Sequence, residues 1–150
     1  MPNLTEAESA AVNAVVKSMS MVRRASERNL MRLGNLNRAQ FEVLLKLYDE
    51  GGQRMYQLAD HLGLSRSTLT YHVGVLLKEG FVSREGGTAQ RRAVTISITE
   101  TGREFVDRTR SEHAKLLKEH FLKQFNSAEL EIITAGCRRV IESFKETKDH

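Results

Sequence analysis

Residues 65–79 read SRSTLTYHVGVLLKE, and this stretch decides the fold. Its apolar residues recur at i, i+4, i+7 and i+8, the spacing of one face of an α-helix: Leu69, Val73, Leu76 and Leu77. The residues on or near the opposite side are mostly small or polar: Ser67, Thr70, Tyr71, Gly74 and Lys78. We therefore expect one face to pack on a core and the other to remain free for contacts.

The limits of this helix are marked on both sides. Ser65 stands at the N-cap position, where its hydroxyl can accept from the amide of Ser67 or Thr68, and Gly80 closes the far end. Upstream, Leu58, Ala59 and Leu62 form a shorter helical stripe, and residues 63–65 (Gly-Leu-Ser) are typical of a turn between two helices at a steep angle. The pattern predicts a helix-turn-helix.

A β-hairpin is predicted after the helix-turn-helix. Residues 81–85 and 93–98 flank a turn region at Gly86-Gly87, and in the second segment apolar Val94, Ile96 and Ile98 alternate with hydroxyl-bearing residues. Residues 53–55 are a candidate for a short third strand, although three residues give little pattern. The hairpin would form a wing beside the helix-turn-helix.

Two further helices are predicted before the helix-turn-helix. The first spans residues 6–33, opens at a capping box (Thr5 and Glu8) and ends at Gly34, with an apolar stripe of Val12, Val15, Val16, Met19, Val22, Ser26, Leu30 and Leu33. Because this stripe is too long for one small lobe, we expect a partner chain to cover part of it. A second capping box, Asn37 to Gln40, opens a helix expected to bury Phe41, Leu44, Leu45 and Tyr48.

Two long helices are predicted at the end of the chain. Thr99 caps the first, whose stripe is Phe105, Val106, Thr109, His113, Leu116, Leu117 and Phe121. The second begins at Asn126 to Glu129 and carries Leu130, Ile133, Cys137, Val140, Ile141 and Phe144. The fold class is mainly α with a small β-wing (α+β), in which a winged helix-turn-helix at 35–99 lies between parts of a helical lobe, 1–34 plus 100–150.

Composition narrows the class of protein. The 150 residues are 40% hydrophobic and 28% charged, which suits one folded unit, and the net charge of +4 favours an acidic partner such as nucleic acid. A single Cys excludes an intrachain disulfide and favours a reducing compartment. Since we find neither a signal-peptide pattern nor a long apolar run, we expect a cytoplasmic protein without a membrane partner.

The chain resembles the MarR-type winged-helix transcriptional regulators. The resemblance is carried by residues 56–65, 79–84, 90–92 and 98–102, and with the flanking helices it covers nearly the whole chain. It implies a homodimer, joined through the helical lobe, that binds a palindromic operator as a repressor and is released by a small phenolic or carboxylate-bearing effector. One departure is Gln90, where the family usually has an acidic residue that braces the wing arginine, here Arg92.

The predicted DNA contacts fall into three groups. Ser65 and Thr68 are expected to lie on phosphate, and the candidates for base edges are Arg66, Ser67, Thr70 and Tyr71. Arg91 and Arg92 are expected to reach the adjacent backbone or minor groove. Lys78, His72 and Arg84 complete the set, with alternatives for two of them: His72 lines the seam between the helices, and Arg84 is a cross-strand partner within the wing.

Other classes of function find less support. The sequence shows no nucleophile with a base and no phosphate-binding Gly-Lys-Ser/Thr loop, so we expect neither an enzyme nor a cofactor. A metal sensor would use His113 and His120, but a spacing of i, i+7 is too wide for one ion unless a third element lies between them. We expect His113 to be a packed, hydrogen-bonded interface residue. Cys137 is expected to be buried and inert. A winged helix that binds protein instead of DNA would present an acidic or apolar face, unlike residues 67–78.

Overall fold

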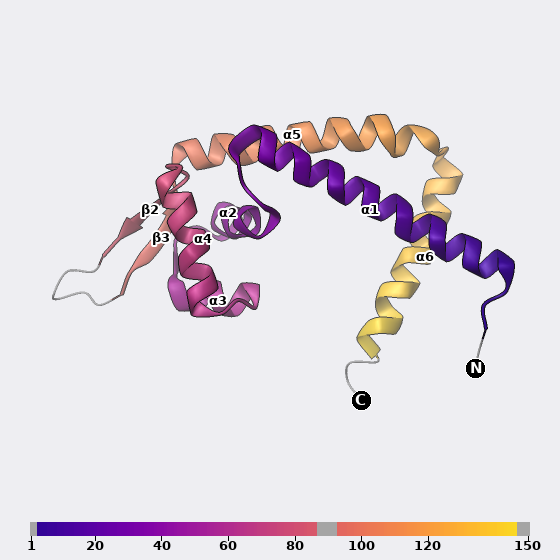
Figure 1. Ribbon diagram of the computed structural model, residues 1–150, viewed down its shortest axis with the longest axis horizontal. Helices are drawn as coiled ribbons and strands as arrows, with labels where there is room; N and C mark the ends of the chain where they lie inside the picture. Colours follow the sequence, from indigo (N-terminus) through magenta and orange to yellow (C-terminus); the bar gives the residue numbers. More distant parts are fainter. Residues whose placement is uncertain (1–2, 87–92, 147–150) are drawn as a thin grey trace. The chain divides into compact units, whose positions relative to one another are not determined.

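The computed structural model describes residues 3–86 and 93–146. Contacts divide the chain into two compact units, Met1–His113 and Ala114–His150. The elements, in order, are α1 (Glu6–Gly34), α2 (Arg38–Glu50), β1 (Gln53–Arg54), α3 (Met55–Leu62), α4 (Arg66–Lys78), β2 (Val82–Glu85), β3 (Thr95–Ile98), α5 (Glu100–His120), the 3₁₀-helix η1 (Leu122–Gln124) and α6 (Ser127–Glu146) (Figure 1). The predicted class, mainly helical with a small sheet, is confirmed.

The helix-turn-helix forms where the sequence predicts it. α3 ends at Gly63, whose φ of 63° lies in the left-handed region that glycine adopts without strain. Ser65 then caps α4, because its Oγ accepts a hydrogen bond from the amide of Thr68 at 3.2 Å. Figure 1 shows α3 and α4 meeting at a steep angle, with α4 running beside the wing strands.

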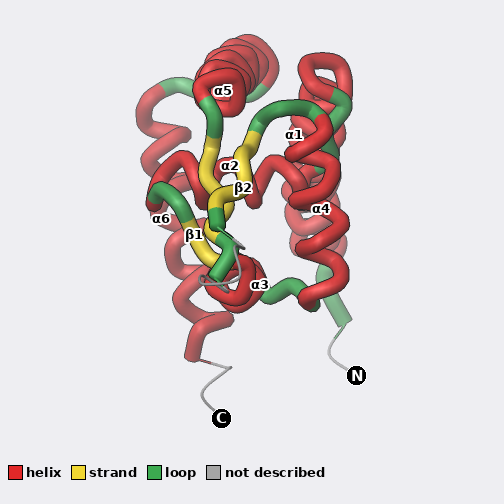
Figure 2. Tube along the Cα trace, turned by 90° about the vertical axis from the view of Figure 1, so that its left-hand side faces the viewer, coloured by secondary structure: helices red, strands yellow, loops and turns green. Residues whose placement is uncertain are grey.

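The three strands form an antiparallel sheet in the order β1-β3-β2 (Figure 2). In its register Val82 lies opposite Ile98 and Arg84 opposite Ile96, while on the other side of β3 Arg54 lies opposite Thr95. The predicted hairpin and the short first strand are both present, although Met55 belongs to α3 and not to the strand. β1 thus joins the wing sheet directly to the start of the helix-turn-helix.

The core of the first unit gathers side chains from its helices and its sheet. Leu36, Leu44, Leu58, Leu69 and Leu76 are fully buried, as are Leu47, Val43 and Val106. α2 differs in detail from the prediction, because Val43, Leu47 and Gln40 are its buried residues besides Leu44, whereas Phe41, Leu45 and Tyr48 are half-buried. These last three lie at the margin of the core, where α5 also packs: Phe41 meets Phe105 edge to face at 6.1 Å.

Two glycines allow close packing around Phe105. A side chain at Gly34 would collide with the Phe105 ring, and one at Gly102 would collide with the backbone carbonyl of Phe81. The Phe81 and Phe105 rings stack with centroids 4.6 Å apart. The end of α1, the start of α5 and the start of β2 therefore meet at one point of the core.

The predicted helix starts are confirmed. Thr5 with Glu8 and Asn37 with Gln40 form complete capping boxes at α1 and α2. Thr99 Oγ1 accepts from the amide of Gly102 at 3.1 Å, and Asn126 and Glu129 exchange bonds at the start of α6. His113 is hydrogen-bonded as expected, with its Nδ1 3.0 Å from Ser26 Oγ on α1.

The prediction of a buried Cys137 is wrong for this chain, because Cys137 is exposed on α6. The apolar stripe of α6 is present, but Val140, Ile141 and Phe144 are all exposed, and Phe144 keeps 70% of its surface. No described helix is both long and apolar enough to span a membrane. Likewise, the described part of the chain has no cluster of three or more His, Cys, Asp or Glu suited to a metal ion.

Candidate DNA-binding surface

α4 has one buried and one exposed face, as its sequence predicts. Leu69, Val73 and Leu76 are buried in the core. The opposite side leaves five residues exposed, Ser67, Thr70, Tyr71, Gly74 and Lys78. Tyr71 keeps 65% of its surface in water, although aromatic rings gain much from burial, so this ring is available to a partner.

Hydroxyl groups hold the first turn of α4 in a local network. Ser65 Oγ donates to Thr68 Oγ1 at 2.8 Å and lies 3.2 Å from Ser67 Oγ, while Thr70 Oγ1 donates to the carbonyl of Arg66 at 2.8 Å. Because Thr70 uses its proton within the helix, its hydroxyl can only accept from a partner. Thr68 accepts from Ser65 and retains a proton to donate outward, which suits a phosphate oxygen.

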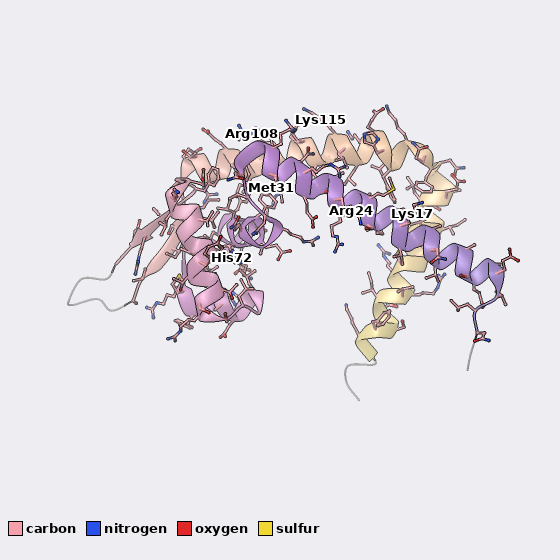
Figure 3. The ribbon with its side chains drawn as sticks, viewed as in Figure 1. Lys17, Arg24, Met31, His72, Arg108 and Lys115 are labelled. Atoms are coloured by element: carbon pink, nitrogen blue, oxygen red, sulfur yellow. The ribbon has the colours of Figure 1, made fainter. Side chains whose placement is uncertain are left out.

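His72 lies in the seam between the helices and not on the exposed face. His72, labelled in Figure 3, is only 8% exposed, and its Nδ1 has no hydrogen-bond partner among the described residues. The ring lies 5.6 Å from that of Tyr71. The structure therefore supports the packing interpretation of His72, and we leave it out of the proposed DNA contacts.

A recess of about 620 Å³ opens between α4, the wing and β1. Arginines from three elements line it: Arg54 of β1, Arg66 of α4 and Arg84 of β2, all of them exposed. Its apolar lining includes Val73, Leu77 and Ile96, and no carboxylate of the described residues lines it. The recess thus combines an apolar floor with a group of cations, a pairing that suits a sugar-phosphate strand.

Two of these arginines revise the sequence-based picture. Arg84 lies opposite Ile96 across the wing strands, as the cross-strand alternative has it, but its side chain is exposed and forms no ion pair within residues 3–86 and 93–146, so its charge remains available to a partner. Arg54 was not among the predicted contacts. Only the pairing of β1 with β3 reveals that it shares a surface with Arg66, and two residues are too few to predict such a strand.

Three residues of the predicted wing site, Gln90, Arg91 and Arg92, lie outside the described residues. The other predicted contacts, Ser65, Arg66, Ser67, Thr68, Thr70, Tyr71, Lys78 and Arg84, are all exposed on the winged-helix part of the first unit. The described surface therefore presents an exposed helix face next to an arginine-lined recess.

The family model for "MarR family" matches residues 36–94, which contain this surface. The HTH-type transcriptional regulator MhqR of Bacillus subtilis is 30% identical over 105 residues, covering 70% of this chain and 72% of MhqR. The chain belongs to the MarR family. This is a family of DNA-binding transcriptional regulators and not of enzymes, in agreement with the sequence-based expectation.

Two further proteins are similar to this chain. YkoM of Bacillus subtilis, an uncharacterized HTH-type transcriptional regulator, is 33% identical over 78 residues, 52% of this chain; the match spans about half the length of YkoM, 51%. Sco3205 of Streptomyces coelicolor, a MarR family regulator solved in complex with DNA, has the same fold, with a TM-score of 0.71, 23% identity, and coverage of 95% of this chain and 94% of Sco3205.

Proposed function

We propose that this protein is a homodimeric repressor that reads a palindromic operator with α4 and is released by a small effector. The observation that carries the proposal is the exposed polar face of α4 beside the arginine-lined recess. Side chains of a helix of this kind fit the major groove, where base edges can be distinguished, while arginines beside it neutralise phosphates. In this proposal Arg66, Ser67, Thr70 and Tyr71 face base edges, and Thr68 and Arg84 face the backbone.

The exposed apolar residues of the terminal helices support the homodimer. Val12, Val15, Val16 and Met19 follow one another along α1 and are all at least half exposed, and Ile141 and Phe144 are exposed on α6. Apolar stripes of this length are covered by a partner in stable proteins. A two-fold dimer requires an operator whose half-sites are about one helical turn apart, and occupying such a site in a promoter would block transcription.

A cavity of about 420 Å³ within the first unit supports the effector. It is lined by residues of α1, α2 and α5, among them Phe41, Ser26, His113 and Thr109. The Thr109 hydroxyl is buried and has no hydrogen-bond partner among the described residues, so a ligand could supply one.

The charged groups around this cavity favour a neutral ligand. Arg38 pairs with Glu42 at 2.9 Å, and Arg110 pairs with Asp49 at 3.2 Å. Because carboxylates of the protein already balance these guanidinium groups, a phenol that bonds to Thr109 suits the cavity better than a carboxylate does. Binding there would act by favouring a form of the dimer with lower affinity for the operator.

The direct test is selection of bound fragments from a random duplex library with the purified protein, followed by titration of a selected duplex at several salt concentrations. If each subunit neutralises about four phosphates, the slope of log affinity against log salt should be about −7. Enrichment of a palindromic sequence with this slope is the expected result. A protein that enriches no sequence and binds duplex DNA without salt dependence would contradict the proposal.

Tyr71→Ala tests whether α4 reads sequence. Because Tyr71 is exposed, its replacement should leave the fold intact, while the loss of a base contact should cost about 1–3 kcal/mol on the selected duplex and much less on a scrambled one. Competition between the two duplexes for the variant and the native protein measures this difference. An equal loss on both duplexes would assign Tyr71 to the backbone and not to the bases.

A further inference from the structure

Gly74 occupies the centre of the exposed face of α4. It follows Thr70 by four residues and Tyr71 by three, and it precedes Lys78 by four, so all three are its neighbours on the helix surface. Glycine in the middle of a helix is less stable than alanine, because its backbone loses more freedom on folding. The presence of glycine at position 74, where alanine would stabilise the helix, therefore needs a physical explanation.

Neither a close packing contact nor an unusual backbone conformation among the described residues explains the glycine. Apart from its two chain neighbours and the backbone of its own helix, a Cβ added at Gly74 would meet no described atom within 4 Å, unlike one at Gly34 or Gly102, where it would collide with neighbouring groups. Nor does the backbone at Gly74 have a positive φ, in contrast to Gly63. The open space above Gly74 is left for something outside this chain, since glycine is used where a backbone must approach a ligand closely.

The surroundings of Gly74 indicate what that ligand is. Gly74 lines the recess between α4, the wing and β1, together with Arg54, Arg66 and Arg84. None of these arginines forms an ion pair with another residue of the described segments, so their charge is available to an anion. The apolar residues Leu77 and Val94, which line the same recess and are only half-buried, suit the hydrocarbon part of deoxyribose better than they suit a free phosphate.

We propose that the recess holds a sugar-phosphate strand of the operator, that Gly74 lets α4 approach this strand, and that Arg54 is a further phosphate contact. This inference rests on the proposed DNA-binding function and adds two residues to it. In this arrangement the absent side chain at position 74 sets the depth at which α4 lies in the groove. Arg54 of β1 and Arg84 of β2 then meet phosphates of this strand, while Arg66 at the start of α4 lies beside them and faces the base edges.

Replacing Gly74 should separate stability from binding. Gly74→Ala should raise Tm by about 2–4 °C, because alanine favours the helix, and should weaken binding to the selected duplex about tenfold; Gly74→Leu should weaken it about a hundredfold. Gly136→Ala is the matched control, since Gly136 is also inside a helix, α6, and its nearest neighbour to an added Cβ lies 3.9 Å away. It should raise Tm by a similar amount and leave DNA binding unchanged.

Replacing Arg54 tests the phosphate contact. Arg54→Ala should weaken binding to selected and scrambled duplexes equally and make the salt slope shallower by about 0.9 per subunit. Arg24→Ala is the control, because Arg24 is an exposed arginine of α1, labelled in Figure 3, outside the recess. Its slope should equal that of the native protein.

The outcomes distinguish this inference from the function on which it rests. If the native protein binds its selected duplex but Gly74→Ala and Gly74→Leu bind it as tightly, the strand does not enter the recess and the inference fails alone. The same holds if Arg24→Ala changes the slope as much as Arg54→Ala does. If the native protein binds no duplex, the proposed function and the inference fail together.

Discussion

The apolar side chains of the winged helix are largely buried, whereas much of the apolar stripes of α1 and α6 is exposed. In the winged helix, Leu44, Leu58 and Leu69 are fully buried. On α1 and α6, by contrast, Val16 is 63% exposed and Phe144 is 70% exposed, although both lie on helices with clear apolar stripes. Apolar residues recur with helical spacing in both regions, but the exposed parts of the stripes on α1 and α6 have no covering surface among the described residues.

This difference indicates which contacts stabilise each region. Burying a leucine or a phenylalanine contributes about 1.5–3 kcal/mol, and the winged helix obtains this contribution within a single chain. The exposed stripes of α1 and α6 obtain it only when another surface covers them. The stability of the winged helix should therefore be independent of protein concentration, whereas that of the terminal helices should depend on assembly.

The largest expected effect is in the core of the winged helix. Leu44→Ala should lower the free energy of unfolding by about 2–5 kcal/mol, because it removes a fully buried side chain and leaves a cavity. Ile132→Ala, at a position 72% exposed on α6, should change it by no more than about 0.5 kcal/mol. Urea denaturation followed by circular dichroism measures both. Similar losses for the two variants would remove the distinction between the regions.

A smaller effect is expected on assembly. Val12→Asp places a charge on the apolar stripe of α1 and should weaken the proposed dimer about a hundredfold, since a buried, unpaired carboxylate is costly. Met21→Asp is the matched control, because Met21 is also exposed on α1 but lies on the other side of the helix. Sedimentation at micromolar concentrations should show monomers for Val12→Asp and dimers for Met21→Asp. A native protein that sediments as a monomer would refute the dimer itself.

The sequence allowed most of the fold to be predicted because local signals mark its boundaries. Thr5, Asn37, Ser65 and Thr99 each begin a helix through hydrogen bonds to residues close in sequence, and such bonds need no tertiary information. Burial was less predictable. Cys137 lies on the apolar stripe of α6 and was expected to be buried, but it is exposed. An apolar stripe indicates that a helix face needs a covering surface, and it does not indicate that the same chain provides that surface.

The residues of the candidate site likewise differ in how far they could be predicted from the sequence. The exposed face of α4 follows from helical periodicity alone, so Ser67, Thr70 and Tyr71 could be found from the sequence. Arg54 could not, because its place beside Arg66 depends on a strand of two residues and on sheet pairing across more than forty positions. The burial of His72 was only partly predictable. Its helical phase places it next to Leu69 and Leu76, but a polar ring at that position was open to two interpretations.

The capping boxes of α1 and α2 show the same difference in exposure at the level of single hydrogen bonds. At α2, Asn37 pairs with Gln40, which is buried and does not titrate. At α1, Thr5 pairs with Glu8, which is exposed and titrates. The bond that the Thr5 backbone amide donates to the Glu8 carboxylate, at 2.8 Å, holds the pKa of Glu8 below its usual value of 4.5, and the Thr5 hydroxyl adds to this effect.

The smallest expected effect is therefore a loss of order in the first turn of α1 at acid pH. Because the pKa of Glu8 is lowered by folding, its contribution is complete above the unfolded value of 4.5 and is lost as the pH falls through the lower, folded value. NMR titration of the Thr5 and Glu8 amides from pH 7 to 3 should show this transition below pH 4.5, while the Asn37 and Gln40 amides stay unchanged. Glu8→Gln keeps an acceptor without a titrating group and should abolish the transition, making the start of α1 behave like that of α2. A Glu8 carboxyl that titrates at or above 4.5 would show that the exposed box does not form in solution.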